Sequence, residues 1–322
     1  MSGYNLFEFA DHISQSELAA DERLKTLVVT LNAFGDTGHT QRLLNNHILN
    51  SLPNHEVGKF DFDQLHDYTD NRPGIVFEFD HFTDYQTPQI VLHEVTDDQG
   101  VPFLLLTGPE PSLRWERMAS SIEALNEQLG IEQTIFLQAI PAPTPHTRPV
   151  FINAYASRPG LISDWDKLPA TIQLQSSFTA MLAVRLGEAS QDVLGLVAHI
   201  PHYLADLEFV DGPLALIKTL RKMEELDLPE GELHKISETT HAAIDSQVES
   251  SEELREVIEQ LERRYDEFVA RRTLTKSGDE IPTADQIGAE VEDFLRQITE
   301  DESSLNDADS EDFEGKSDSD TG

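Results

Sequence analysis

The sequence of 322 residues contains no cysteine, few basic residues and no long apolar run. Without cysteine, the chain forms no disulfide, thiolate zinc site, iron–sulfur cluster or cysteine nucleophile. Lys and Arg total 23 against 60 Asp and Glu, which gives a formal net charge of -37. Because so acidic a surface repels phosphate backbones and anionic lipid, we expect neither nucleic acid nor membrane as a partner.

Targeting signals and familiar catalytic motifs are missing as well. The most apolar stretches, residues 101–107 and 193–200, are far shorter than the roughly 20 residues that a membrane span needs. The first residues lack the basic and apolar regions of a signal peptide, so we expect a soluble, cytoplasmic protein. The chain has no phosphate-binding loop with its lysine, no G-x-G-x-x-G, no G-x-S-x-G and no H-E-x-x-H.

Strand-like and helix-like segments alternate between residues 24 and 230. The expected strands are residues 24–34, 56–62, 74–79, 89–95, 101–107, 132–140 and 193–200. Four helices are expected. One follows residue 40, one begins at Pro111 and Ser112 with Ser112 as N-cap, and the other two cover residues 178–188 and 213–226. This alternation predicts an α/β sandwich, and the hairpin formed by residues 89–107 makes its sheet a mixed one. Ligands of such sheets meet the loops at the carboxyl ends of the strands.

The C-terminal part has a different pattern. Residues 232–248 and 251–270 are expected to be helices, 271–282 a loop, and Thr283 to open a last helix with a capping box. Residues 299–322 carry ten acids and one base, so they should be disordered. We therefore predict an α/β domain at 1–230, a helical extension at 231–298 and a disordered acidic tail at 299–322.

Two strand-to-helix loops contain acidic residues beside glycine. In the first, Gly35-Asp36-Thr37-Gly38-His39, the helix start offers backbone N–H groups to an anion. The alternative is a tight turn in which Asp36 caps the helix, and this alternative is favoured. In the second, residues 107–112, Glu110 precedes a helix and favours its start electrostatically, or acts as a ligand for a metal or a hydroxyl group.

Two further loops contain histidine. Four prolines stiffen residues 141–149, which hold His146 for proton transfer and Arg148 for binding carboxylate or phosphate. The alternative is that this loop packs against a neighbouring subunit while Arg148 pairs with one of many acids. His199 and His202 flank Ile200-Pro201 after a strand, where hydrogen bonds to their own loops are favoured over metal binding.

Four segments carry a resemblance to a known family: LNAFGDTGHT (31–40), LLLTGPEPSLRW (104–115), PHTRP (145–149) and AHIPHYLADLEF (198–209). In this order, they resemble the proteasome assembly chaperone 2 family, in particular its actinobacterial branch. The resemblance spans residues 24–240. It implies a three-layer αβα sandwich with a mixed sheet, akin to the phosphorylase/hydrolase-like fold, with a C-terminal helical extension.

The resemblance also implies a mode of action. Eukaryotic relatives assemble proteasome α-rings in pairs, and archaeal relatives form homo-oligomers. It supplies no catalytic residue, cofactor or metal, so none is assigned to this chain. The final residues, SDSDTG, differ from the C-terminal motif with which eukaryotic members engage proteasome subunits.

Two functions follow from these observations. The first is a non-enzymatic, assembly-chaperone-like scaffold that self-associates, with a trimer expected, and binds protein partners. The alternative is an enzyme or binder of a phosphate- or nucleotide-like molecule. In that case the site is formed by residues of the strand-end loops: Asp36, Gly38, Glu110, His146, Arg148, His199 and His202. Convergence of these side chains on one pocket favours the alternative, whereas pairing with acids favours the scaffold.

Overall fold

The computed structural model describes residues 6–32, 36–69, 72–162, 171, 173–223 and 225–276. The chain divides into two compact units, Met1–Lys167 with Ser176–Glu267, and Leu168–Gln175 with Phe268–Gly322. The first unit contains the sheet and every candidate site residue discussed below. The helix expected after Thr283 and the acidic tail at 299–322 lie outside the described residues.

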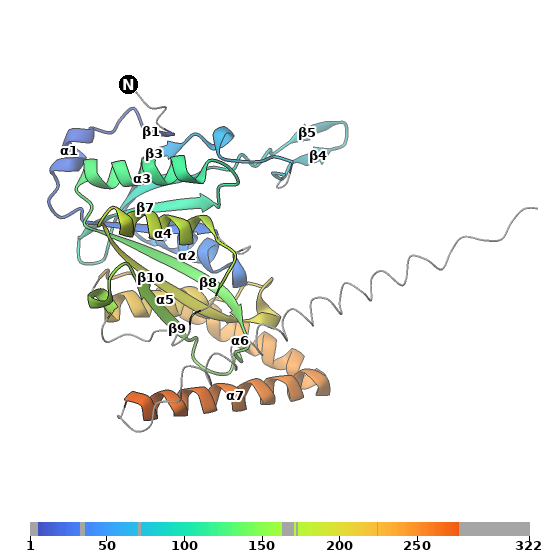
Figure 1. The fold of residues 1–322 in the computed structure, drawn as a ribbon. Helices are drawn as coiled ribbons and strands as arrows, with labels where there is room; N and C mark the ends of the chain where they lie inside the picture. The colour runs from blue at the N-terminus through green and yellow to red at the C-terminus, as the bar shows by residue number, and fades with distance from the viewer. Residues whose placement is uncertain are drawn as a thin grey trace, which may run out of the picture. The chain divides into compact units, whose positions relative to one another are not determined.

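An eight-stranded mixed sheet forms the centre of the first unit (Figure 1). Its strand order is β1-β3-β6-β7-β2-β8-β10-β9, in which β7, β2, β8 and β10 are parallel and the outer pairs are antiparallel. Its strands are β1 (Phe7–Phe9), β2 (Thr26–Asn32), β3 (Asn54–Phe60), β6 (Val91–Thr96), β7 (Pro102–Pro109), β8 (Gln133–Ala142), β9 (Ile152–Ala156) and β10 (Asp192–Pro201). The predicted mixed sheet and the hairpin of β6 and β7 are confirmed.

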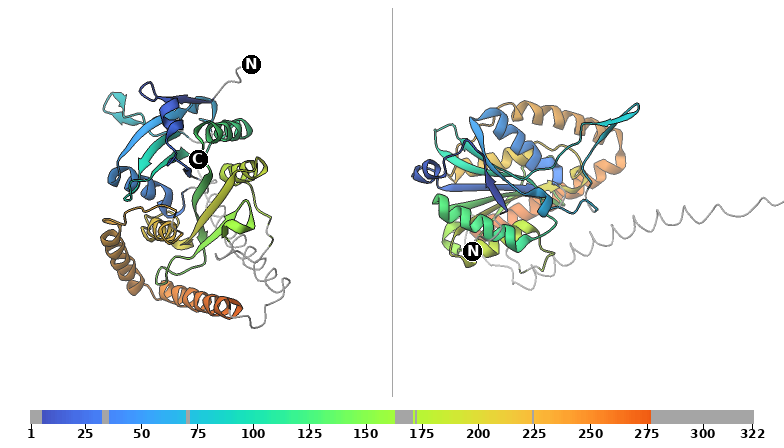
Figure 2. Two further views of the ribbon diagram at one scale, coloured as in Figure 1. Left: turned by 90° about the vertical axis from the view of Figure 1, so that its left-hand side faces the viewer. Right: turned by 90° about the horizontal axis from the view of Figure 1, so that it is seen from above.

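Helices cover both faces of this sheet, so the predicted αβα sandwich is confirmed (Figure 2). One face packs against α2 and α5, and the other against α1, α3 and α4. The helices are α1 (Gln15–Ala20), α2 (Thr40–Ser51), α3 (Trp115–Leu129), α4 (Phe178–Glu188), α5 (Asp211–Lys222), α6 (Leu233–Ser250) and α7 (Glu252–Lys276). Strand β2 shows why two cores form: Leu27 and Val29 enter one core, whereas Val28 between them enters the other.

Several expected boundaries were wrong, among them the end of α5, which lies at Lys222 and not at residue 226. Helix α3 begins at Trp115 and not at Ser112, because Arg114 before it has a left-handed backbone (φ 58°) that interrupts the helix. Helix α7 continues to Lys276, so the loop expected from residue 271 starts later. The end of α3 is as predicted, since Gly130 adopts the left-handed conformation (φ 70°) that favours glycine.

Three strands and one α-helix were absent from the sequence prediction. They are β1, β5 (His81–Thr83), β9 and α1, each of six residues or fewer. The segment expected as a strand at 74–79 pairs with no strand of the large sheet. Its central residues form β4 (Val76–Glu78), which pairs with β5 as a separate two-stranded hairpin.

Candidate functional site

The loop between β2 and α2 uses its own backbone donors. The carboxylate of Asp36 accepts hydrogen bonds from the backbone N–H groups of Gln41 (2.7 Å) and Arg42 (3.1 Å). The N–H of Gly38 donates to the carbonyl of Ala205 (2.6 Å). The next two N–H groups donate to carbonyls within the turn, at Asp36 and Thr37. Every backbone donor of residues 38–42 is therefore occupied, and the carboxylate stands where an anion would bind.

Packing explains the residues of this turn. Gly38 has φ 63°, and a Cβ atom there would lie 2.9 Å from Cγ2 of Ile200, so only glycine fits without displacement. Burial raises the pKa of Asp36, and the two backbone hydrogen bonds oppose this rise by stabilising the carboxylate. The helix cap is thus built from a buried acid whose oxygens already have donors.

Glu110, at the end of β7, serves a different helix from the one expected. Its Oε1 accepts a hydrogen bond from the backbone N–H of Phe178 (2.5 Å), the first residue of α4. Ser177 completes that cap by accepting from Ala180 N–H (3.1 Å). Burial raises the pKa of Glu110, and the Phe178 hydrogen bond opposes the rise. The expectation that Glu110 stabilises the helix directly after it, α3, was wrong because the chain turns this side chain toward α4.

His146 lies buried between two elements, with its side chain 1% exposed. Its backbone N–H donates to the hydroxyl of Tyr203 (2.8 Å), and its Nδ1 lies at the same distance from that oxygen. Its Nε2 lies 3.2 Å from Oδ1 of Asp245 on α6. Burial raises the pKa of Tyr203 to about 12, so the hydroxyl stays protonated at neutral pH. This chain of groups ties the proline-rich loop to α6.

Arg148 makes a bidentate ion pair with α7. Its Nε and Nη2 lie 2.8 and 2.9 Å from the two carboxylate oxygens of Asp266, and Nη1 lies 3.1 Å from Glu262. Tyr265, between them, donates its hydroxyl to the carbonyl of Pro149 (2.8 Å). The guanidinium lowers the pKa of Asp266 through its hydrogen bonds. Arg148 thus pairs with acids of the same chain, as one interpretation expected of this side chain, whereas the packing of its loop against a neighbouring subunit stays a prediction.

The two histidines after β10 separate. His199 Nε2 lies 2.7 Å from Oδ1 of Asn153 on β9, and burial lowers the pKa of His199 to about 4. His202 lies exposed in a short 3₁₀ helix (His202–Leu204), where its ring contacts that of Tyr203. Among residues of known placement, no group of three or more His, Asp or Glu is arranged to hold a metal ion. The described helices are also too short or too polar to cross a bilayer.

The loops come together through these bonds, but their polar side chains do not converge. Gly38 exchanges backbone hydrogen bonds with Ala205 and Phe209, which joins the first loop to the last. Tyr203 joins the last loop to His146. Glu110 faces α4 instead. The functional side chains expected from the sequence therefore hold neighbouring elements together.

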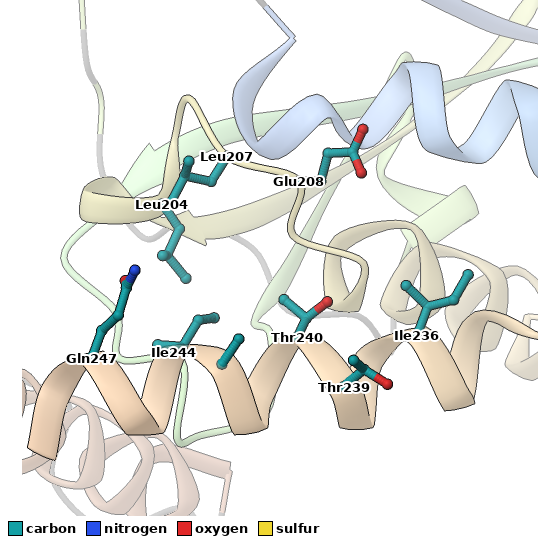
Figure 3. Close-up of a pocket in the computed structure, with 9 residues that line it drawn as sticks. Leu204, Leu207, Glu208, Ile236, Thr239, Thr240, Ile244 and Gln247 are labelled. Atoms are coloured by element: carbon teal, nitrogen blue, oxygen red, sulfur yellow. The ribbon is translucent and has the colours of Figure 1, made fainter.

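An apolar groove lies beside these loops, between the segment after β10 and one face of α6 (Figure 3). It encloses about 330 Å³. Its walls are Leu204, Leu207, Glu208, Ile236, Thr239, Thr240, Ala243, Ile244 and Gln247. Leu207 and Ile236 are about half exposed. Glu208 is the one charged wall residue, and its carboxylate pairs with Arg42 at 2.9 Å.

Sequence reasoning missed this groove. The available signal was the spacing of Ile236, Thr240 and Ile244, which places one uncharged stripe along α6. The other wall lies within the segment AHIPHYLADLEF, whose histidines attracted attention in place of Leu204 and Leu207. Asp211, at the start of α5, fixes the stripe in position by accepting hydrogen bonds from Ser237 and His241 of α6.

Comparison with known proteins places this fold among relatives. The PAC2 family profile matches residues 30–248. A protein of unknown function from Mycobacterium tuberculosis is 35% identical, with a TM-score of 0.78, and the match covers 85% of this chain and 94% of that one. A protein of unknown function from Corynebacterium glutamicum is 30% identical, with a TM-score of 0.76, and the match covers 83% and 99%. A proteasome-assembly chaperone homologue from Mycobacterium tuberculosis shares the fold at 20% identity, with a TM-score of 0.64 and coverage of 72% and 99%. No curated protein matches.

Proposed function

Because the chain belongs to the PAC2 family, we propose that it is a non-enzymatic, assembly-chaperone-like scaffold that self-associates and binds protein partners. The family name and the solved proteasome-assembly chaperone homologue support a chaperone-like role. The observation that carries the proposal is the use of the polar groups at the strand ends. Asp36, Glu110, His146, Arg148 and His199 each bind a partner within the chain, so they form no shared polar pocket.

We assign self-association to the apolar groove of α6. A chain with a net charge of -37 repels its own copies, so two copies must meet where charge is low. The groove meets this condition, because its single acid is paired with Arg42 and its other walls are uncharged. Burial of the half-exposed Leu207 and Ile236 against a second copy then supplies a hydrophobic driving force. We propose a trimer as the assembly.

Light scattering at several concentrations tests this assignment. The native chain should approach three times the 36.1 kDa of one chain as concentration rises. Leu207→Glu should shift the oligomer toward monomer, because it places an unpaired acid in the groove. Val184→Glu adds the same charge at an exposed position of α4 and should leave the mass unchanged. A monomer at every concentration, or equal behaviour of the two variants, would contradict self-association through the groove.

A further inference from the structure

The hairpin of β4 and β5 presents an apolar face that stays exposed within the described part of the chain. Figures 1 and 2 show the hairpin extending away from the large sheet. Phe77 and Phe82 are direct cross-strand partners, with ring centroids 5.0 Å apart, and both are more than half exposed. Ile75, directly before β4, is a further exposed apolar side chain at 51%.

The tip of this hairpin also exposes an apolar side chain. Phe79 occupies the two-residue turn, is 93% exposed and has a left-handed backbone with φ 52°. Hairpin turns normally place Gly, Asn or Asp at such positions, because a bulky residue is strained there. A Phe side chain has a surface of about 150 Å² or more. The exposed parts of Phe77, Phe79 and Phe82 together therefore approach the roughly 300–600 Å² of the largest apolar patch on a typical monomer. The largest apolar patch of a monomer is often functional, which makes this face a candidate interaction surface.

Charge distinguishes this face from the groove of α6. Residues 73–89 contain Glu78, Asp80 and Asp84 and no Lys or Arg. His81 lies 2.8 Å from Asp80, but within the described ranges no Lys or Arg forms an ion pair with any of the three acids. A second copy would bring the same acids into contact with them, and the resulting repulsion opposes a self-contact. A partner with positive charges around an apolar surface gains energy from both features.

The shape of the face specifies the partner further. Two paired strands lie about 5 Å apart, so with its side chains the face is roughly as wide as one α-helix, about 10 Å. We propose that the β4–β5 hairpin is a docking arm for an amphipathic helix of a partner protein whose apolar stripe is bordered by Lys or Arg. The phenylalanines contact the stripe, and Asp80 in the turn and Asp84 after β5 face the basic border, whereas Glu78 lies on the opposite face of the hairpin. This inference rests on the proposed function only in that the chain binds protein partners.

Two designed helical peptides test the arm with a defined probe. Both carry the same leucine stripe, and the border consists of lysine in one peptide and glutamate in the other. Fluorescence anisotropy with the full chain should show binding of the lysine peptide and at least about tenfold weaker binding of the glutamate peptide. The double variant Phe77→Ser/Phe82→Ser should weaken binding of the lysine peptide about tenfold or more. Phe79→Ser, which leaves the paired strands untouched, should also weaken it.

Val184→Ser is the matched control. It removes an equally exposed apolar side chain from α4, where Ser and Val have similar helix propensity. It should bind the lysine peptide like the native chain. Equal binding by the native chain and the hairpin variants would overturn the proposal, because the peptide would then be attracted only by the net charge. Absence of binding to the native chain would overturn it as well.

Self-association, measured on the same samples, separates this inference from the proposed function. Leu207→Glu should reduce self-association and retain peptide binding, whereas Phe77→Ser/Phe82→Ser should do the opposite. Conversion of an oligomer to a monomer by the hairpin variant would overturn the proposal, since the hairpin would then bind a second copy. A monomeric native chain that binds the lysine peptide through the hairpin would support the arm and contradict the assembly.

Discussion

The sequence left two possibilities for the start of α2, a bound anion or a cap by Asp36, and the structure places the Asp36 carboxylate there. Asp36→Ala should lower the free energy of unfolding by about 2 kcal/mol, because two helix N–H groups lose their acceptor and alanine resists the φ of 57°. Asp36→Asn keeps one acceptor oxygen and tolerates this backbone, so it should cost less. Urea denaturation of both variants measures the difference. Two variants as stable as the native chain would show that the cap contributes nothing.

His199 should make stability depend on pH. Its pKa is about 4 in the folded chain, against 6.5 for the ordinary side chain. Between these values the unfolded chain takes up a proton that the folded chain refuses, so stability is complete above pH 6.5 and falls as pH drops toward 4. From pH 7 to pH 5 the loss due to His199 should be on the order of 2 kcal/mol.

The variant His199→Gln isolates this contribution. Glutamine retains a donor for Asn153 but does not titrate. Burial also lowers the pKa of His93, which contributes in both proteins and cancels from the comparison. Denaturation at pH 7 and pH 5 should therefore show a smaller loss for the variant. An identical loss in the two proteins would contradict the buried, neutral state of His199.

At this scale, the sequence indicated which residues lie in strand-end loops but not what they bind. The cap by Asp36 was predictable because the acceptor and its donors are five or six residues apart. The partners of Arg148 and Glu110 lie 118 and 68 residues away in the chain. In a sequence with 60 acids, nothing local distinguishes Asp266 as the partner of Arg148.

At the scale of elements, the pairing of β9 with β10 depends on Gly195. Its direct partner in the register is Tyr155, whose Cζ would lie 2.0 Å from a Cβ atom at position 195. Gly195→Ala should cost about 3 kcal/mol, since the ring must move and lose its hydrogen bond to Gln138 (2.7 Å). In a Tyr155→Ala background, Gly195→Ala should lower the free energy of unfolding much less. A double-mutant cycle measures this difference. Equal costs in both backgrounds would place the strain elsewhere.

The ion pair of Arg148 should hold α7 to the proline-rich loop. Because the guanidinium and its acids are partly exposed, Arg148→Ala should lower global stability only slightly. Hydrogen exchange within residues 252–267 should nevertheless accelerate, since the helix loses its bidentate contact. Arg263→Ala removes the same charge from α7 at an exposed position and should leave this exchange unchanged. Similar exchange in the two variants would mean that Arg148 does not hold the helix.

The elements that the sequence predicted well are those with strong periodicity and clear end signals. Helix α4 begins and ends where expected, at residues 178 and 188, because Ser177 caps an apolar repeat. Strand β9 was missed because it is only five residues long, and its fit depends on Tyr155 lying opposite a glycine of another strand. The separate pairing of β4 was also beyond a local pattern, because its exposed phenylalanines resemble those of a buried strand.

At the scale of the whole molecule, charge divides the surface into two kinds of apolar site. The groove of α6 contains one acid, which is paired with Arg42, whereas the β4–β5 hairpin carries three acids that no described Lys or Arg pairs with. This difference supports contact between copies at the groove and contact with a basic partner at the hairpin. Protein binding, and not chemistry at the strand ends, is therefore the central claim.

A thermal-shift screen of the full chain tests that claim most directly. The ligands are nucleotides, phosphorylated metabolites and divalent metals. A ligand present at about 100 times its dissociation constant stabilises the folded chain by roughly 2.7 kcal/mol. We predict no specific stabilisation, because the polar groups of the strand-end loops are already paired. A stabilising ligand whose effect is lost in Asp36→Asn or Arg148→Ala, but kept in Arg263→Ala, would contradict the scaffold and establish a small-molecule site.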